Sequence, residues 1–338
     1  MLPPGACPTG WQPGAAVPDA NNDRLTQVAG ALAALTGAGD AALLLGVSGG
    51  PDSMAMLDLI AHCWTGPVSA ATVDHGLRPE SADEAAMVAR YCAKLGVAHA
   101  TLRPDAPITG SVQSAARAVR YCLLEREAER CGADFIVTAH HADDQFETML
   151  MRLARGSGVD GLAAVRARNG RVIRPLLRLR KTDLERHCAD HAIPFVRDPS
   201  NANADFDRVR MRAALATFDA VDPLQAVRSA AALADAVDAL DWITAREAAT
   251  AVRLERDGAT LTCHDYPAAL LRRLVLRCLD HVQPGIAPRG QALGRVIIAL
   301  QAGGQTMIGD VLCTGGTTWR FVRAPARRPD RSAARATE

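Results

Sequence analysis

The chain has 338 residues, of which 49% are hydrophobic and 22% charged, a composition typical of a globular protein with one large and one smaller domain. The formal net charge is +1, so any surface that binds nucleic acid must be local. Nine cysteines without a Cys-x-x-Cys pair indicate buried thiols in a reducing compartment. No stretch approaches the roughly 18 to 20 apolar residues that span a bilayer, and the N-terminus lacks the basic start of a signal peptide. We therefore expect a cytoplasmic protein with no membrane partner.

Residues 1–22 are rich in Pro, Gly and Ala and show no apolar period, which predicts a flexible extension. After them, short runs that are apolar throughout alternate with helical patterns of roughly 12 to 20 residues. The expected strands and helices, in chain order, are 41–47, 52–64, 68–73, 81–95, 97–102, 112–131, 135–139 and 143–154. This alternation predicts a doubly wound α/β fold, in which a parallel sheet is covered by helices on both sides. Such a sheet binds ligands at the carboxyl ends of its strands.

The alternation stops after a last apolar run at 172–177. Helical patterns then follow at 182–192, 206–218, 223–250, 266–279 and 290–300, and a glycine pair between apolar runs predicts a short hairpin over 303–322. We expect a catalytic domain over 23–220, a small and mostly helical C-terminal domain with this hairpin over 221–323, and a disordered basic tail over 324–338.

A glycine pair between two serines joins the first expected strand to the first expected helix. The loop consists of Ser48, Gly49, Gly50, Pro51, Asp52 and Ser53. Backbone N–H groups at the start of a helix point toward an anion bound there, and the helix dipole favours it. The pattern is neither a Walker A loop nor a dinucleotide-binding Gly-x-Gly-x-x-Gly motif. We therefore expect a phosphate-binding loop that differs from both of these motifs.

Asp52 is unusual in such a loop, because a carboxylate next to a polyphosphate is repelled unless a cation lies between them. Mg²⁺ held by one or two carboxylates and by phosphate oxygens fits this arrangement. The alternative is that Asp52 or Ser48 caps the helix and that the glycines serve a tight turn.

Polar residues also end the second and fourth expected strands. Asp74 and His75 follow the second strand, and Ala139 and His140 follow the fourth. Because the carboxyl ends of parallel strands share one edge, we expect these residues near the phosphate loop. The histidine pair that includes His140 has no third ligand at zinc spacing, so a zinc cage is not expected.

Three carboxylates begin the helix after the fourth strand. Asp143 and Glu147 are four residues apart and Asp144 and Glu147 three apart, so they share a helix face. Near a triphosphate they are candidates for Mg²⁺ ligands or general bases. The alternative is that they cap the helix and have no chemical role.

The loop matches the motif of N-type ATP pyrophosphatases, the PP-loop superfamily, and the later motifs narrow the resemblance. Their order resembles that of tRNA(Ile)-lysidine synthetases over about residues 25–215. The motifs lie at 48–53, 73–78, 113–121, 140–148, 155–162, 174–177 and 198–201. The resemblance implies an adenine nucleotide alpha hydrolase-like catalytic domain that uses ATP and Mg²⁺. It also implies the reaction: ATP adenylates C2 of the wobble cytidine in an isoleucine tRNA with a CAU anticodon, and the ε-amine of L-lysine displaces AMP to form lysidine.

The resemblance also implies residue roles. ATP would be bound by the six loop residues together with Asp74, His75, Ala139 and His140. Asp52 and Asp144 would hold Mg²⁺. The remaining catalytic candidates are Glu147, which would position metal or lysine, and three arginines that would stabilise developing charge: Arg117, Arg208 and Arg212. Many relatives have Arg-Asn after the 198–201 segment, whereas this chain has three arginines, so the resemblance leaves open which of Arg208, Arg210 and Arg212 functions.

A basic strip over 152–186 contains ten Arg or Lys residues against three acidic ones. It predicts salt-dependent contacts with tRNA phosphates, or else a solvated surface in an arginine-rich protein. The basic tail has the same two interpretations. The sequence leaves the oligomeric state open, and a homodimer is one expectation.

Three other activities fit the sequence less well. A PP-loop tRNA thiolase would be expected to contain Cys-x-x-Cys pairs, which this chain lacks. A glutamine amidotransferase would need a nucleophilic cysteine at the start of a glutaminase domain, and Cys7 lies in a Pro-rich segment. A non-catalytic RNA-binding module would be expected to have lost Asp52 or the carboxylates that end with Glu147.

Overall fold

The computed structural model describes residues 20–76, 80–105, 112–197, 207–215, 218, 220–288 and 290–324. The chain divides into two compact units, one ending at residue 233 and the other beginning at residue 234. This division lies inside helix α9 (Pro223–Ala251), later than the boundary after residue 220 that the sequence suggests. All but the first residue of the expected tail and most of the expected extension lie outside the described residues. Within the described ranges, every helix is too short or too polar to span a bilayer.

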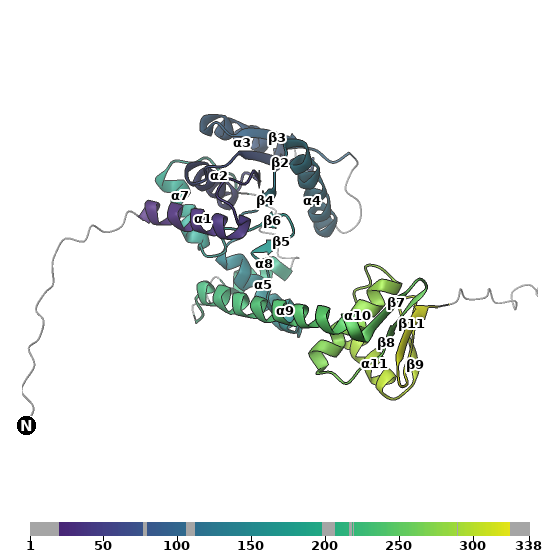
Figure 1. The fold of residues 1–338 in the computed structure, drawn as a ribbon. Coiled ribbons are helices and arrows are strands. Elements are labelled where there is room, and N and C mark those ends of the chain that lie inside the picture. Colours follow the sequence, from purple (N-terminus) through teal and green to yellow (C-terminus); the bar gives the residue numbers. More distant parts are fainter. Residues whose placement is uncertain are drawn as a thin grey trace, which may run out of the picture. The chain divides into compact units, whose positions relative to one another are not determined.

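The first unit is built on a sheet whose strand order, over the described residues, is β3-β2-β1-β4-β6-β5 (Figure 1). The strands are β1 (Leu43–Gly46), β2 (Val68–Val73), β3 (Ala98–Leu102), β4 (Phe135–Val137), β5 (Arg168–Asn169) and β6 (Val172–Ile173). All neighbouring pairs are parallel except β5 and β6. The predicted doubly wound parallel sheet is confirmed, with an antiparallel edge strand that was not predicted.

Helices cover both faces of this sheet. Alternate residues of a strand face opposite sides, and Leu43 and Leu45 join one buried core while Leu44 joins the other. The first core is closed by α1 (Ala20–Thr36), α2 (Pro51–Cys63), α3 (Ser81–Leu95) and α7 (Lys181–Asp190). The second is closed by α4 (Val112–Cys131). Figure 1 shows α1, α2 and α7 on one side of the sheet and α4 on the other.

The apolar run at 172–177 forms a strand only over its first two residues, so this expectation was too long. Pro175 has no N–H to donate to a neighbouring strand, which ends the pairing. The remaining helices of the first unit are α5 (Ala142–Ala154), α6 (Val159–Leu162) and α8 (Asp207–Leu215). The order of the strands reverses at β1, which lies between β2 and β4, and this is where sheets of this kind bind ligands.

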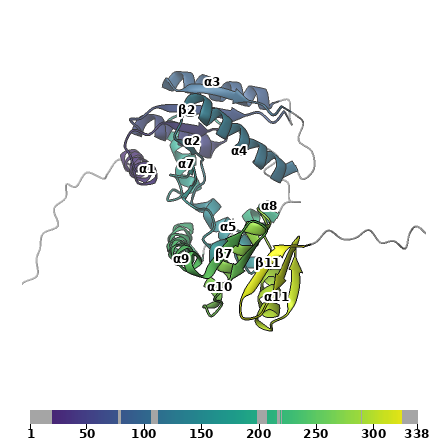
Figure 2. The ribbon, with the colours of Figure 1, turned by 45° about the vertical axis from the view of Figure 1, so that its right-hand side comes forward.

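The second unit contains more sheet than the sequence indicated. Its strands form an antiparallel sheet in the order β7-β8-β11-β10-β9 over the described residues. They are β7 (Val252–Glu255), β8 (Gly258–Leu261), β9 (Gln305–Ile308), β10 (Val311–Thr314) and β11 (Trp319–Arg323). The helices α10 (Ala268–Val282) and α11 (Gly290–Gln301) pack on this sheet around Trp319 and Phe321 (Figure 2). The expected hairpin corresponds to β9, β10 and β11, whereas β7 and β8 were not predicted.

Candidate active site

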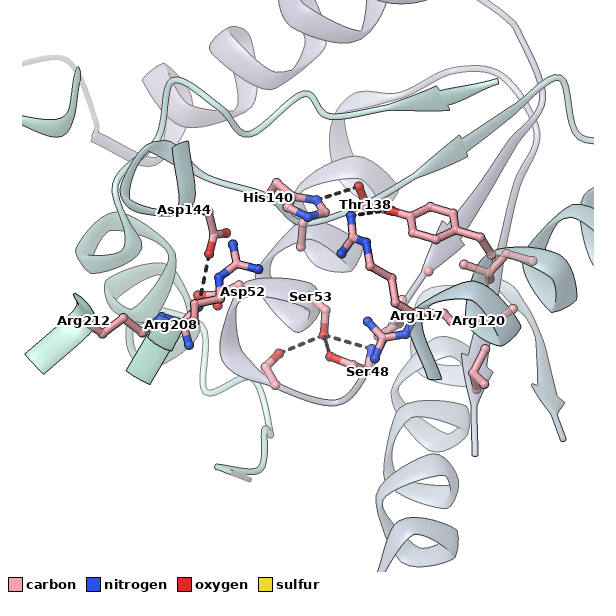
Figure 3. Close-up of a pocket in the computed structure, with 18 residues that line it drawn as sticks. Ser48, Asp52, Ser53, Arg117, Arg120, Thr138, His140, Asp144, Arg208 and Arg212 are labelled. Carbon is pink, nitrogen blue, oxygen red and sulfur yellow. Dashed lines mark hydrogen bonds and ion pairs between the residues drawn. The ribbon is translucent and has the colours of Figure 1, made fainter. Parts of the chain in front are cut away.

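A cavity of about 270 Å³ lies in the first unit at the carboxyl edge of β1, β2 and β4 (Figure 3). The loops after β1 and β4, helix α4, the first turn of α5 and helix α8 all contribute side chains to it. The lining residues are Gly46, Val47, Ser48, Gly50, Asp52, Ser53, Ala71, Val73, Arg117, Arg120, Tyr121, Leu124, Thr138, Ala139, His140, Asp144, Arg208 and Arg212. Acidic and basic side chains therefore line the same cavity at the strand ends.

The glycine–serine loop forms the turn from β1 into α2. Gly49 has a φ of +84°, which disfavours any residue with a side chain. The Ser53 hydroxyl accepts the Ser48 N–H at 3.1 Å and donates to the Gly50 carbonyl at 3.0 Å. The N-cap of α2 is Gly50, and no side chain of the described residues caps this helix. The capping alternative for Asp52 and Ser48 is therefore wrong, and the N–H groups of the first turn face the cavity side of the loop, where they suit an anion.

Asp52 lies in the first turn of α2 with its two oxygens in different environments. Its Oδ2 atom is 3.5 Å from the Nε2 atom of His141. Its Oδ1 atom is buried and has no hydrogen-bond partner among the described residues. A buried carboxylate oxygen without a partner costs free energy unless a bound group satisfies it. The position beside a phosphate-binding turn fits a cation.

His141 is buried at the start of α5, between carboxylates. Its Nε2 atom is also 3.4 Å from Asp144 Oδ2, and its Nδ1 atom is 3.5 Å from Asp143 Oδ2. Burial alone would lower the pKa of His141, but the carboxylates of Asp143, Asp52 and Asp144 outweigh burial and raise this pKa to about 10. The imidazole is therefore cationic at neutral pH and offsets part of the local negative charge.

Asp144 and Asp143 point in different directions although they are adjacent. Asp144 lines the cavity, accepts the His141 backbone N–H at 3.3 Å and contacts the Arg212 Nη2 atom at 3.3 Å. Asp143 instead accepts the Lys181 backbone N–H at 2.7 Å and contacts Arg180 at 3.2 Å, at the start of α7. Asp144 thus makes the capping contact that the sequence left open and also faces the cavity, while Asp143 is engaged by another helix.

Glu147 is buried behind the cavity wall and is engaged by two arginines of α8. Its Oε1 atom accepts a hydrogen bond from Arg208 Nε, and its Oε2 atom accepts one from Arg212 Nε at 2.7 Å. Both arginines line the cavity, whereas Glu147 and Arg210 are not among the described lining residues. The structure therefore brings Arg208 and Arg212 to the site from one face of α8, since residues four apart share a helix face.

Two further arginines lie on the opposite wall, on α4. Arg117 and Arg120 both line the cavity, together with Tyr121. The Arg117 guanidinium lies 5.2 Å from the centre of the Tyr121 ring, within cation–π range. Figure 3 shows Asp52, Asp144, Arg208 and Arg212 on one side and Arg117 and Arg120 on the other. Arg120 and Tyr121 belong to the 113–121 motif but were not predicted as site residues, although their spacing of three and four residues from Arg117 places them on its helix face.

His140 and Ala139 line the cavity at the end of β4, as the motif predicts. The Nδ1 atom of His140 is 2.9 Å from the hydroxyl of Thr138, another lining residue that the sequence analysis did not single out. Burial lowers the pKa of His140 to about 4, against the opposing charge of Asp144. His140 is therefore neutral at pH 7, in contrast to the adjacent His141.

Asp74 is buried in the turn after β2 and is not among the described lining residues. Its Oδ1 atom accepts hydrogen bonds from the Ser81 hydroxyl at 2.6 Å and the Gly76 N–H at 2.9 Å. Its Oδ2 atom accepts one from Arg103 at 3.1 Å. The carboxylate thus holds the turn that leads from β2 to α3.

His75 is also not among the described lining residues. Both of its ring nitrogens are buried and lack a hydrogen-bond partner among the described residues, and burial lowers its pKa. Residues 77 and 78, which end this motif, and the 198–201 segment lie outside the described residues.

Several arginines of the basic strip make contacts within the first unit. Arg168 donates to the Leu35 carbonyl and packs against the Phe135 ring, and Arg174 is buried and donates to the Arg166 carbonyl. By contrast, the side chains of Arg152, Arg155 and Arg178 are exposed. The strip is therefore partly structural and partly surface.

Comparisons with known proteins identify the family. A family model described as a PP-loop domain matches residues 22–218. A tRNA(Ile)-lysidine synthase of Zymomonas mobilis is 41% identical over 293 residues, covering 84% of this chain and 89% of that protein. One of Novosphingobium aromaticivorans is 42% identical over 296 residues, covering 85% of this chain and 90% of that protein. This chain belongs to the tRNA(Ile)-lysidine synthase family. The family expected from the sequence motifs is thus confirmed.

A solved structure supports the fold of the catalytic unit. The U34-tRNA thiolase of Methanococcus maripaludis, determined with its 4Fe-4S cluster, matches with a TM-score of 0.53 and 16% sequence identity. The match covers 63% of this chain and 79% of that chain. At this identity the likeness shows a shared fold and carries no information on activity. Membership of the tRNA(Ile)-lysidine synthase family makes this chain an ATP-using PP-loop ligase.

Proposed function

We propose that this chain converts the wobble cytidine of an isoleucine tRNA with a CAU anticodon to lysidine. In the first step the C2 oxygen of the cytidine attacks the α-phosphorus of ATP, and pyrophosphate leaves. In the second step the ε-amine of L-lysine forms a bond to C2 and loses a proton, while the C2–O bond breaks and AMP leaves with that oxygen. The names of the relatives support this reaction. The structural observation that carries it is the unpartnered Asp52 oxygen beside an uncapped helix start.

Pyrophosphate would be held by the loop from Ser48 to Ser53. The N–H groups of the first turn of α2 are the donors available there, and the Ser48 hydroxyl lines the same cavity. Asp52 and Asp144 are the carboxylates that would bind Mg²⁺, which supplies positive charge between them and the phosphate oxygens. The Oδ1 atom of Asp52 fits this role because it is buried and otherwise unsatisfied.

Four arginines would stabilise the negative charge that shifts from the α-phosphate to pyrophosphate and then to AMP. Arg117 and Arg120 are available on one wall, and Arg208 and Arg212 on the other. Fixed cations aimed at developing charge are worth more in a partly enclosed site than in water. We assign Glu147 to positioning the α8 arginines, because both of its oxygens are engaged by them.

The tRNA would approach the same edge of the sheet. The exposed arginines at the end of α5, Arg152 and Arg155, and the exposed Arg178 are candidates for contacts with backbone phosphates. Such contacts position a tRNA without reading its sequence, and they weaken with added salt.

The proposal is tested by incubating the purified chain with ATP, Mg²⁺, labelled L-lysine and a CAU-anticodon isoleucine tRNA. We expect label in the tRNA, recovered as lysidine after nuclease digestion. Asp52→Asn keeps the shape of the side chain but removes its charge, and it should lower the rate by about 10²- to 10³-fold, as expected for loss of a group that stabilises the transition state.

A second arm replaces lysine with a sulfide donor. Incorporation of sulfur, as by a tRNA thiolase, would contradict the proposal, and so would a lack of modification with any tRNA. Asp105→Asn is a matched control, because Asp105 is exposed, contacts Arg126 and is not among the described cavity residues. It should leave the rate unchanged.

A further inference from the structure

His141 lies where the two proposed cation ligands meet, yet it is not among the described residues that line the cavity. Its side chain is almost fully buried. One nitrogen, Nε2, is within 3.5 Å of a carboxylate oxygen of both Asp52 and Asp144. We propose that His141 is a positioning residue that fixes these two carboxylates in the orientation that binds the divalent cation. This inference rests on the proposed function.

In both Asp52 and Asp144, the two carboxylate oxygens have different partners. His141 contacts the Oδ2 atom of Asp52 and the Oδ2 atom of Asp144. This leaves the Oδ1 atom of Asp52 without a partner among the described residues and the Oδ1 atom of Asp144 against Arg212. One oxygen of each carboxylate thus contacts His141. The other oxygen is left for a cation in Asp52 and contacts Arg212 in Asp144.

His141 is itself in contact with Asp143, which is not among the described lining residues. Its Nδ1 atom has no hydrogen-bond partner among the described residues and lies 3.5 Å from Asp143, whose carboxylate accepts the Lys181 N–H and contacts Arg180 at the start of α7. Its backbone N–H donates to Asp144. A contact chain therefore runs from α7 through Asp143 and His141 to both carboxylates. Outer groups of this kind set the orientation of the groups that bind a metal.

A histidine between the two carboxylates is useful because the carboxylates repel each other. Two carboxylates directed to one small cation repel each other before the cation arrives, and each has several side-chain rotamers. A hydrogen-bond donor between them reduces the repulsion and selects the rotamers in advance, so less of the binding free energy is lost to ordering.

The test compares nucleotide affinity with and without the cation, which needs no turnover. Calorimetry would give the Kd of a non-hydrolysable ATP analogue, α,β-methylene-ATP, once in Mg²⁺ and once in EDTA. The ratio of the two Kd values is the gain due to the cation. For His141→Gln, which retains a donor but cannot reach both carboxylates, we expect this gain to fall by about 10- to 100-fold, while the Kd in EDTA changes little.

His187→Gln is the matched control. His187 is also buried and bonded to a carboxylate, that of Asp58 at 2.8 Å, but it is not among the described cavity residues. Unfolding temperatures are measured for both variants, and the Kd values refer to the folded fraction. His187→Gln should keep the gain due to the cation even if it unfolds at a lower temperature.

Two results would overturn the inference, and they are distinguishable. If His141→Gln keeps the full gain due to the cation, His141 is only a cap of α5 and the proposed function is unaffected. If the unmodified chain shows no such gain, the proposed cation site fails and the inference fails with it. A rise in the Mg²⁺ concentration needed for half-maximal lysidine formation by His141→Gln, with the maximal rate recovered at excess Mg²⁺, would support it further.

Discussion

Arg208 and Arg212 reach the cavity because Glu147 holds them there. The carboxylate of Glu147 is buried, and each of its oxygens accepts a hydrogen bond from the Nε atom of one arginine. Each guanidinium keeps part of its surface exposed and so retains donors for a substrate phosphate. The spacing of four residues puts both arginines on the face of α8 that packs against α5.

This arrangement predicts that Arg208 and Arg212, and not Arg210, function in the reaction. Arg208→Ala and Arg212→Ala should each lower the rate of lysidine formation by about 10²- to 10³-fold, because each removes a cation from the developing charge. Arg210→Ala should leave the rate close to that of the unmodified chain. Single-turnover rates at saturating ATP and lysine provide the measurement. An Arg210→Ala variant as slow as Arg208→Ala would contradict the assignment.

Several of the cavity residues could be predicted from the sequence because they belong to motifs at strand ends. Asp52, Asp144 and His140 all line the cavity. Asp74 also follows a strand, but it is not among the described lining residues. Its oxygens accept hydrogen bonds from Gly76, Ser81 and Arg103 instead. A motif places a residue at the edge of the sheet, whereas the direction of its side chain depends on turn hydrogen bonds that no spacing reveals.

At the scale of elements, α2 is held in place by a buried polar network with α3 and α7. Asp58 on α2 accepts a hydrogen bond from the Tyr91 hydroxyl at 2.7 Å and lies 2.8 Å from the Nε2 atom of His187. The Cys188 thiol also contacts the Pro51 carbonyl in the first turn of α2. The helix that carries Asp52 is thus anchored from the side remote from the cavity.

The network predicts a stability effect that depends on pH. Burial alone would raise the pKa of Asp58, but hydrogen bonds from His187 and Tyr91 outweigh it and lower the pKa below its ordinary value. A lowered folded-state pKa stabilises the fold above the unfolded-state pKa of about 4 and loses that effect as the pH falls through the folded value. Asp58→Asn should therefore cost about 1 to 3 kcal/mol at pH 7 and progressively less below about pH 4.

Urea denaturation at pH 7, 5 and 3.5 measures this difference. Asp105→Asn is the control, since Asp105 and its partner Arg126 are both exposed. Exposed pairs contribute at most about 1 kcal/mol, so this variant should have a small effect at every pH. An Asp58→Asn cost that stayed constant from pH 7 to 3.5 would rule out the carboxylate as its source.

The central strands could be predicted because they are buried on both faces. Leu43, Leu44 and Leu45 are all fully buried, and a continuous apolar run is the pattern such a strand requires. β7 is instead an edge strand with mostly exposed residues, including Arg253 and Glu255, so its apolar content is low. The turn between β7 and β8 consists of Arg256 and Asp257, so the Asn-Gly or Asp-Gly centre that is typical of a hairpin turn is missing.

At the scale of the whole molecule, the sequence predicted the catalytic unit better than the second unit. The PP-loop match over residues 22–218 corresponds to the alternation of apolar runs and helices read from the chain. The second unit depends on pairing between β8 and β11, which are separated by more than fifty residues. Periodicity within a window detects local elements, and it does not reveal pairing over such a separation.

The central claim is that one chain couples cleavage of ATP between its α and β phosphates to attachment of lysine. The most direct measurement counts both products in one reaction, using ATP labelled at the α-phosphate, labelled lysine and a CAU-anticodon isoleucine tRNA. We expect AMP and lysidine in equal amounts, formed only when ATP, Mg²⁺, lysine and tRNA are all present. Formation of ADP in place of AMP, or of AMP without lysine in the tRNA, would contradict it.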